Sequence, residues 1–599
     1  MKSTHQNLRN FKFWLIVALV TLAWVVPILW LHSQNSRLLA SWHGFLHSGI
    51  ATRYLTDSAF PPENPFYAGE IIPYYCFYHY VGYLAAQAFR IDLLHAFQGF
   101  SLTGLFIVIL FGALTGIKTF KSLAVGLLIG YFALAGQNPF GPVIAAAKHL
   151  VKDVPLIENF SREDPVETVF VTDKQADDWM TQPLLPDLYI GSNWKHGQNF
   201  VWFYDISSRT VAISLLMVLL FLVLVPRQSL VVKFFAMLTA FLMTAFNPLI
   251  GLAASGSLLG GTVLAPFFPM RGISFRKYLV DIKTPLFVIA LFCLLGSLLS
   301  FPTFQHLLQQ NHKTVTFSHP ISYVLLKLAA TVANSIVLVP LALFGWKFSG
   351  EKSRAKIKPL AISGLLLLGA VPVFSILPGN EHNLSNTAQF FLAVPAAVAV
   401  PLLGKQIHHI SDRFTFLKGI NWQLRLPVLA VLTFLPTTLC TFFSYTGRPA
   451  IPLITKGQQL LRAPVEGTLQ QFYNWVSTTT PPDAVFIIDP DRAVKMSGNV
   501  SELPAFTNRT LFRDKDTYLT TPYKDSQLRV EIAKRLTRGI ALSETQTQYL
   551  MNLGRPLYLL SYDARKTEVL EHLATRYGEP DFHQDFIAVF QLNLHLNRK

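Results

Sequence analysis

The sequence has little charge and little cysteine for its length. Only 14% of its 599 residues are charged, whereas a soluble globular chain carries about 25%. The three cysteines, Cys76, Cys293 and Cys440, lie in apolar or aromatic stretches and form no CxxC pair. This pattern argues against a disulfide framework and against a structural zinc site.

The sequence also lacks the short motifs of several large enzyme classes. It contains no GxxxxGK[ST], no GxGxxG after a strand, no HExxH and no GxSxG. The chain therefore lacks the usual signatures of four enzyme classes, namely P-loop ATPases, Rossmann dehydrogenases, zincin proteases and α/β-hydrolases. The net charge of +16 comes from basic residues in loops beside apolar segments. Because they do not interleave with aromatics on a helical face, we expect no nucleic-acid partner.

Apolar residues dominate what is present. They make up 51% of the chain, and phenylalanine alone contributes 48 residues. A membrane-spanning helix needs about 20 predominantly apolar residues. Twelve segments approach this length, namely 13–31, 74–91, 99–117, 120–136, 210–225, 234–247, 249–268, 284–301, 321–346, 359–377, 386–404 and 426–444. The composition therefore predicts a mostly α, multi-pass integral protein of the plasma or inner membrane.

The loop charges predict the orientation of these spans. Basic residues gather at the N-terminus and in alternate loops from residue 226 onward, and the positive-inside rule places them in the cytoplasm. Loops 32–73 and 137–209 and the region 445–599 are then external. An internal N-terminus and an external C-terminus need an odd number of spans. We therefore expect about eleven transmembrane helices, with one of 74–91, 99–117 and 120–136 not crossing.

Residues 445–599 have the composition of a soluble domain, set apart from the membrane part at 1–444. Short apolar runs at 484–489, 556–562 and 586–592 predict strands, and amphipathic spacing at 525–539 and 564–578 predicts helices. Because strands and helices alternate, we expect a small extracytoplasmic α/β domain.

The first external loop carries a concentration of titratable side chains. The segment 38–55 is predicted to be a helix at the membrane surface, with His43 and His47 four residues apart on one face. Pro61, Pro62 and Pro65 end this helix and hold Glu63 and Asn64 between them. We expect His43, His47 and Glu63 to form the catalytic group.

The same loop resembles the GT-C superfamily of integral membrane glycosyltransferases. The resemblance rests on a pattern HGxxH, PPENP, AG and YY, at His43–His47, Pro61–Pro65, Ala68–Gly69 and Tyr74–Tyr75, and extends weakly to NPLIG at 247–251 and GNEHN at 379–383. It implies a GT-C-like bundle that transfers a sugar from a polyprenyl-phosphate-linked donor to an external glycan, lipid or protein. The bilayer itself is a further partner.

The loop departs from the family at one position. Many GT-C enzymes carry an acidic residue early in this loop, but the matching place reads Ser41-Trp42-His43. Either His43 takes over the role, or Asp57, Glu63 or Glu70 supplies the carboxylate, or catalysis is lost. Imidazole is a plausible base because its unperturbed pKa of about 6.5 lies close to neutral pH.

Several further polar residues near the external end are predicted to bind substrate. Arg53 could face the donor phosphate or bind lipid headgroups, while Asp205 lies in an aromatic stretch and Glu381 at a re-entry point. The full predicted set is Arg53, Asn64, Glu70, Tyr75, His79, Asp205, Glu381 and His382. No cofactor is firmly implied. His43 and His47 could bind a divalent cation with Glu63 or His79, although the metal-free interpretation is favoured.

Two other functions remain open from the sequence. A transporter or flippase of lipid-linked glycans would also be polytopic, although such proteins often show two repeated halves, and none is visible here. A non-catalytic cell-envelope assembly protein of the same fold is the second alternative, because the early carboxylate is missing.

Overall fold

The computed structural model describes fourteen stretches of the chain: 2–34, 44–57, 59–139, 198–204, 206–225, 229–268, 292–299, 315–318, 321–376, 382–411, 421–455, 463–490, 501–515 and 519–593. The predicted site residues His43, Asp205 and Glu381 lie outside these residues. So do most of the predicted second external loop and most of the predicted span 284–301.

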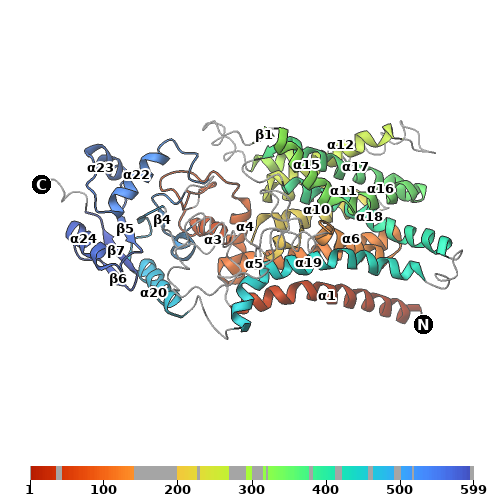
Figure 1. Ribbon diagram of the computed structural model, residues 1–599, viewed down its shortest axis with the longest axis horizontal. Helices are drawn as coiled ribbons and strands as arrows, with labels where there is room; N and C mark the ends of the chain where they lie inside the picture. The colour runs from red at the N-terminus through yellow and green to blue at the C-terminus, as the bar shows by residue number, and fades with distance from the viewer. Residues whose placement is uncertain are drawn as a thin grey trace.

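A helical bundle forms one half of the molecule (Figure 1). Its helices are α1 (Lys2–Gln34), α4 (Phe77–Phe89), α5 (Leu93–Thr115), η2 (Gly116–Phe120), α6 (Leu123–Ala135), α9 (Val201–Tyr204), α10 (Ser208–Leu224), α11 (Leu230–Phe246), α12 (Pro248–Leu264), η3 (Ala265–Phe267), α15 (Ile321–Ser335), α16 (Leu338–Phe348), α17 (Glu351–Val373), α18 (His382–Ser411) and α19 (Trp422–Thr455). Strands β1 (Val315–Phe317) and β2 (Phe374–Ile376) pair antiparallel beside it.

The predicted polytopic helical fold is confirmed. Within the described residues, six helices are long and apolar enough to cross a membrane, or seven if the bent pair from Lys327 to Phe348 counts as one span. Three shorter apolar helices, α6, α10 and α11, accompany them. The core between these helices consists of aliphatic and phenylalanine side chains, as burial in an apolar bundle requires.

Contacts at one end of the bundle bring the basic segments together. Lys356 Nζ donates to the carbonyl of Leu224 at the end of α10, 2.9 Å away. Thr119, in the turn after α5, donates to the same carbonyl at 3.2 Å. Lys358 Nζ donates to the carbonyl of Phe268 after η3 at 2.6 Å. The ends of α10, η2 and η3 and the start of α17 therefore share one basic end of the bundle.

Helix α4 lies at the end of the bundle opposite the basic segments. A Cβ added at Gly104 of α5 would lie 2.6 Å from Ser214 Oγ near the start of α10, so α5 and α10 run in the same direction. α4 packs on the first turns of α5, where the rings of Tyr78 and Phe97 stack at 4.8 Å, and on the end of α11, where the rings of Phe77 and Phe246 lie 5.1 Å apart. Which of the segments 74–91, 99–117 and 120–136 does not cross stays a prediction.

The C-terminal half is an α/β domain, as predicted. Its five-stranded sheet has the order β4-β3-β5-β7-β6, with β3 parallel to β4 and β5, and β7 antiparallel to β5 and β6. The strands are β3 (Val485–Ile488), β4 (Thr510–Leu511), β5 (Leu557–Ser561), β6 (Phe582–Gln584) and β7 (Ile587–Gln591). The helices are α20 (Ala463–Thr479), α21 (Leu503–Thr507), α22 (Ser526–Thr537), α23 (Glu544–Met551) and α24 (Thr567–Tyr577).

The three predicted strands and both predicted helices of this domain are present. The sequence did not reveal β4 or β6, because strands of two and three residues are too short for a periodic pattern. The division of the chain at residue 444 stays a prediction. In the structure α19 continues without a break to Thr455.

The first loop is buried against the C-terminal domain, which corrects the prediction of an exposed surface helix. All nine residues of α3 (Gly44–Thr52) are buried, and the 3₁₀ turn η1 (Arg53–Leu55) follows it. Phe45 of α3 packs on Phe506 of α21, with ring centroids 5.6 Å apart. The apolar side of the predicted helix therefore faces protein rather than lipid, because the C-terminal domain supplies an apolar partner surface.

The chain after η1 continues this contact through a turn that bonds β4. Leu511 N donates to the carbonyl of Pro65 at 2.9 Å, and Ala68 N donates to the carbonyl of Leu511 at 2.9 Å. The turn at 65–68 is therefore fixed by backbone hydrogen bonds to the edge strand of the sheet. Figure 1 shows α3 between the bundle and the C-terminal domain.

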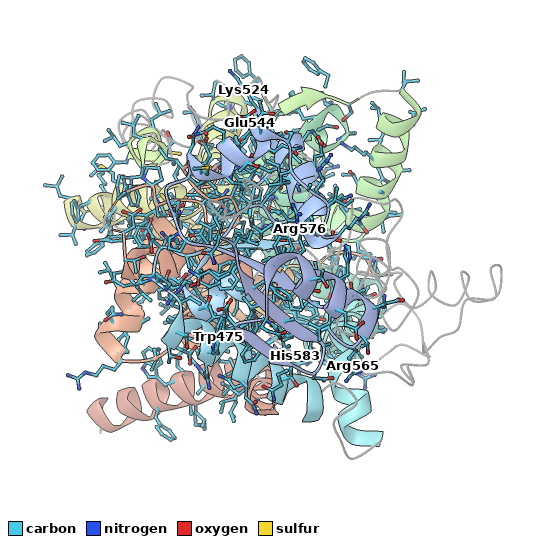
Figure 2. All side chains as sticks on the ribbon, turned by 90° about the vertical axis from the view of Figure 1, so that its left-hand side faces the viewer. Trp475, Lys524, Glu544, Arg565, Arg576 and His583 are labelled. Carbon is cyan, nitrogen blue, oxygen red and sulfur yellow. The ribbon has the colours of Figure 1, made fainter. Side chains whose placement is uncertain are left out.

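The opposite face of the C-terminal domain is polar. Figure 2 looks onto this face, where the labelled side chains Lys524, Glu544, Arg565 and Arg576 are all exposed. Charged residues of both signs alternate there, as is typical of a surface in contact with water. The domain therefore buries one side against the first loop and turns the other to solvent.

Candidate functional site

Two buried histidines meet where α3 contacts α4. His47 Nδ1 and His79 Nε2 are 2.8 Å apart, and the two residues are 1% and 0% exposed. In such a contact one ring nitrogen donates and the other accepts, so at least one imidazole is neutral. The aromatic rings of Tyr74, Tyr78 and Phe97 surround the pair. The structure therefore brings together two of the predicted site histidines.

A chain of hydroxyl groups leads from this pair toward α10. The Tyr74 ring lies 5.7 Å from the His79 ring, and its hydroxyl bonds that of Tyr75. Tyr75 Oη lies 2.7 Å from Ser208 Oγ, the first residue of α10. Asn247 Nδ2 also bonds Ser208 Oγ, at 3.2 Å. The predicted residue Tyr75 thus connects the first loop to the bundle.

Local sequence explains why these groups stand at helix starts. Asn247 precedes Pro248, and its Oδ1 accepts from Ile250 N at 3.1 Å, so it caps α12. Asparagine at the cap followed by proline at the first helical position is a favoured start. Ser207 caps α10 in the same way and sets Ser208 and Arg209 in its first turn.

A cation lies beside this helix start. Arg209 Cζ lies 4.0 Å from the centre of the Trp202 ring, and the Trp202 ring stacks on His382 with centroids 5.2 Å apart. His382 is the first residue of α18. Arg209 is partly buried, in the first turn of α10, where the helix dipole also favours a negative charge. Guanidinium groups suit phosphate because their N–H donors match its oxygens.

These residues form one polar cluster at the end of the bundle opposite the basic segments. The cluster comprises His47, Tyr74, Tyr75, His79, Trp202, Ser208, Arg209, Asn247 and His382. It combines a neutral imidazole, which can take a proton, with a cation at a helix N-terminus, which can bind an anion. General-base catalysis and phosphate binding are therefore both chemically available in one place.

Glu63 does not join this cluster. Its Oε2 accepts from Arg53 Nη2 at 2.7 Å, and its Oε1 accepts from Gly69 N at 2.8 Å and from Arg555 in the C-terminal domain. We call Arg53, Glu63 and Arg555 the first-loop clamp. Burial lowers the pKa of Arg53 from its ordinary value, and the charge of Glu63 opposes that shift. The catalytic role of Glu63 stays a prediction.

Asn64 and Glu70 also contact the chain itself. Asn64 Nδ2 donates to the carbonyl of Leu519 at 2.7 Å and to Tyr523 Oη at 3.1 Å. The backbone carbonyl of Glu70 accepts from Asn64 N at 2.7 Å. These contacts order the proline-rich turn against the C-terminal domain. Substrate binding by Arg53, Asn64 and Glu70 stays a prediction.

The described residues contain no set of side chains placed to bind a metal ion. Among the described residues, no group of three or more histidine, cysteine, aspartate or glutamate side chains is placed to hold a metal ion. His79 bonds His47 directly, and Glu63 belongs to the first-loop clamp. His43, Asp205 and Glu381 lie outside the described part of the chain.

The predicted site residues did not include five members of the cluster, namely Tyr74, Trp202, Ser208, Arg209 and Asn247. The helix-start signals Ser207-Ser208-Arg209 and Asn247-Pro248 could have indicated two helix N-termini. They could not indicate that these termini meet, because residues 75, 208 and 247 are far apart in sequence.

The chain was compared with known proteins. No protein-family model matches it, and no curated protein matches it. The chain is similar to the structure of ArnT from Cupriavidus metallidurans bound to undecaprenyl phosphate, at 12% identity and a TM-score of 0.49, covering 97% of this chain and 98% of that one.

Two further similar structures carry the names of transferases. One is the archaeal oligosaccharyltransferase AglB from Archaeoglobus fulgidus with an inhibitory peptide and a dolichol-phosphate, at 12% identity, TM-score 0.40, and coverage of 96% and 72%. The other is the arabinofuranosyltransferase AftD from Mycobacteria, at 11% identity, TM-score 0.45, and coverage of 95% and 39%.

Proposed function

We propose that this protein is a GT-C-type integral membrane glycosyltransferase. It transfers a sugar from a polyprenyl-phosphate-linked donor to an extracytoplasmic glycan, lipid or protein. The observation that carries the proposal is the polar cluster, which unites the His47–His79 pair with Arg209 at the start of α10. A base and a phosphate-binding cation are the two groups that such a transfer requires.

The reaction assigns a role to each of these groups. The acceptor hydroxyl oxygen forms a bond to the anomeric carbon of the donor sugar. The bond from that carbon to the phosphate oxygen breaks, and the lipid phosphate leaves with the electron pair. The imidazole of the His47–His79 pair takes the acceptor proton. Arg209 and the N-terminus of α10 stabilise the charge that develops on the leaving phosphate.

The experiment is a transfer assay with purified protein and labelled polyprenyl-phosphate sugars. We expect His47→Gln to lower turnover about 100-fold or more, the usual effect of losing a general base. Arg209→Gln should weaken donor use by a similar factor. His409→Gln is the matched control, because His409 is exposed at the far end of α18 and should retain full transfer. Unchanged transfer in both cluster variants would refute the assignment.

One observation favours a second function, a non-catalytic assembly role. The polar cluster contains no carboxylate among its described members, and the nearby Glu63 is held by two arginines. A protein that binds the lipid-linked sugar without transferring it would need only the cation and the aromatic surface. Donor binding by the wild type with no transfer to any acceptor would support this role.

A further inference from the structure

Four buried amide side chains lie between α6 and α18. Gln198 and Asn199 precede α9, while Asn386 and Gln389 lie on the second and third turns of α18. We call these four residues the amide cluster. Each is at most 2% exposed to solvent. Amides at this depth need hydrogen-bond partners, because burial without a partner is costly.

The nitrogen atoms of three of these amides have partners. Gln389 Nε2 donates to the carbonyl of Phe132 at 2.7 Å, Asn199 Nδ2 donates to that of Ala133 at 2.9 Å, and Gln198 Nε2 donates to that of Ala135 at 3.1 Å. These three carbonyls belong to the last turn of α6, where helical partners run out; the carbonyl of Phe132 also accepts from Gly136 N at 2.9 Å. Because a carbonyl can only accept, these contacts determine which amide atom is nitrogen.

The oxygen atoms of the same amides have none. Gln198 Oε1, Asn199 Oδ1 and Gln389 Oε1 are buried and make no hydrogen bond, and neither Oδ1 nor Nδ2 of Asn386 has a partner. The amide cluster therefore offers four acceptors and one N–H donor group without using them. A protein rarely leaves so many polar atoms unpaired in one place unless something else binds there.

The ratio of acceptors to donors indicates the chemistry of the occupant. An anion is disfavoured, because the oxygens would repel it. A cation would satisfy the oxygens but would face the N–H groups of Asn386 and the positive end of the α18 dipole. A hydroxyl group donates one hydrogen bond and accepts others, so several hydroxyls together suit both kinds of atom.

The amide cluster adjoins the polar cluster. Asn386 lies four residues after His382 on α18, hence on the same helical face, and Asn199 lies three residues before Trp202. The stacked Trp202 and His382 rings thus form an aromatic wall one turn away. Resting on the glycosyltransferase function proposed above, we infer that the amide cluster binds the uncharged, hydroxyl-rich glycosyl group of a substrate.

The test compares Asn386→Leu with Gln137→Leu. Gln137 is also buried, and its Nε2 donates to the carbonyl of Ser385 at 3.0 Å, but its Oε1 is not one of the fully buried atoms without a partner. We expect Asn386→Leu to raise the KM for a neutral hexose substrate about tenfold, with kcat within about twofold, because hydrogen bonds to the sugar are lost. Its melting temperature should stay equal or rise, since unpaired buried atoms are removed. Gln137→Leu should lower the melting temperature and leave KM unchanged.

Measuring the KM separately for the donor and for the acceptor shows which of the two substrates supplies the bound sugar. If the KM for the polyprenyl-phosphate hexose rises, the donor sugar occupies the amide cluster, and if the KM for the glycan acceptor rises, the acceptor does. A donor carrying a uronic acid should be used poorly by the wild type and be little affected by Asn386→Leu.

A second measurement is independent of transfer. A neutral methyl hexoside should raise the melting temperature of the wild type and not that of Asn386→Leu, whereas the corresponding uronic acid should shift neither. If the wild type transfers sugar from no donor, the proposed function fails. The shift in melting temperature with the methyl hexoside then decides by itself whether the amide cluster binds a sugar. If Asn386→Leu and Gln137→Leu behave alike in both measurements, buried water fills the amide cluster and the inference is overturned.

Discussion

The contacts of Glu63 differ from those expected of a catalytic base. A carboxylate between prolines in an external loop suggested a catalytic base, but Glu63 is held by Arg53 and Arg555 and by Gly69 N. These donors occupy both oxygens of the Glu63 side chain. The geometry therefore favours a structural role, in which Glu63 connects the first loop to the C-terminal domain.

The first prediction is that Glu63→Gln destabilises the protein without abolishing its transfer reaction. The substitution leaves Arg53, only 6% exposed, without its charge partner. Breaking such a buried pair costs about 3 kcal/mol. Chemical unfolding in detergent should detect this loss, and Glu70→Gln, whose side chain lies outside the clamp, should change stability little. Transfer lost from Glu63→Gln protein that remains folded would restore the catalytic assignment.

A second residue-scale prediction concerns Asp525 at the start of α22. Burial by itself raises the pKa of Asp525, but hydrogen bonds from Tyr549 and Tyr67, together with the charge of Arg529, outweigh burial and lower this pKa below its ordinary value. A carboxyl group with a lowered folded-state pKa contributes stability above its unfolded pKa of about 3.9. That contribution is lost as the pH falls through the lower folded-state value.

We therefore expect the C-terminal domain to lose stability as the pH drops from about 5 to below 4. Asp525→Asn should be less stable at neutral pH and should show a flatter pH dependence in this window. Thermal unfolding followed at several pH values measures both effects. An unchanged slope in Asp525→Asn would assign the acid sensitivity to other carboxyl groups. Asp483→Asn is a suitable control, because Asp483 is exposed.

At the scale of elements, glycines determine how closely α5 approaches α6. Gly112 and Gly116 follow a GxxxG spacing, and Gly126 and Gly130 repeat it on the other helix. A Cβ added at Gly116 would lie 2.2 Å from Gly126 N, and one at Gly126 would lie 2.7 Å from the Ala113 carbonyl oxygen. Small residues at this spacing let membrane helices pack backbone to backbone.

Gly126→Leu should therefore separate these two helices. Because backbone atoms of α5 cannot move aside as side chains can, we expect a loss of at least about 3 kcal/mol, at the upper end of overpacking effects. Melting temperature and the yield of monodisperse protein measure this loss. Gly99→Leu is the matched control on α5, since a Cβ there meets nothing within 4 Å. Equal melting temperatures for the two variants would contradict the close packing.

At the scale of the whole molecule, two ends differ in chemistry. The basic contacts of Lys356 and Lys358 mark one end, while the polar cluster and the C-terminal domain lie at the other. The positive-inside rule predicts that the basic end is cytoplasmic and that the C-terminal domain is extracytoplasmic.

Cysteine labelling in intact cells or spheroplasts tests this orientation. Thr545→Cys, exposed on α23, should react with a membrane-impermeant maleimide, and Lys347→Cys, exposed at the basic end, should react only after permeabilisation. The wild type, which carries the three native cysteines, measures the background labelling; Cys76 and Cys293 are buried. The reverse pattern would invert the topology and place the polar cluster in the cytoplasm.

The sequence by itself determined the membrane class, the helical fold and the strands β3, β5 and β7. Each depends on local composition or on a period of a few residues, which any short window contains. His47 and His79 were both among the predicted site residues, but the predicted pair was His43 with His47. The direct contact of His47 with His79, 32 positions away, was not predicted.

The contacts of the remaining candidates became visible only in the folded chain. Glu63 pairs with Arg555, 492 positions away, so no local pattern could show that it belongs to a clamp. The buried state of α3 depends on α21, which the sequence places more than 450 residues later. Long-range partners decide whether a polar side chain is satisfied or left available, and only the folded chain brings those partners together.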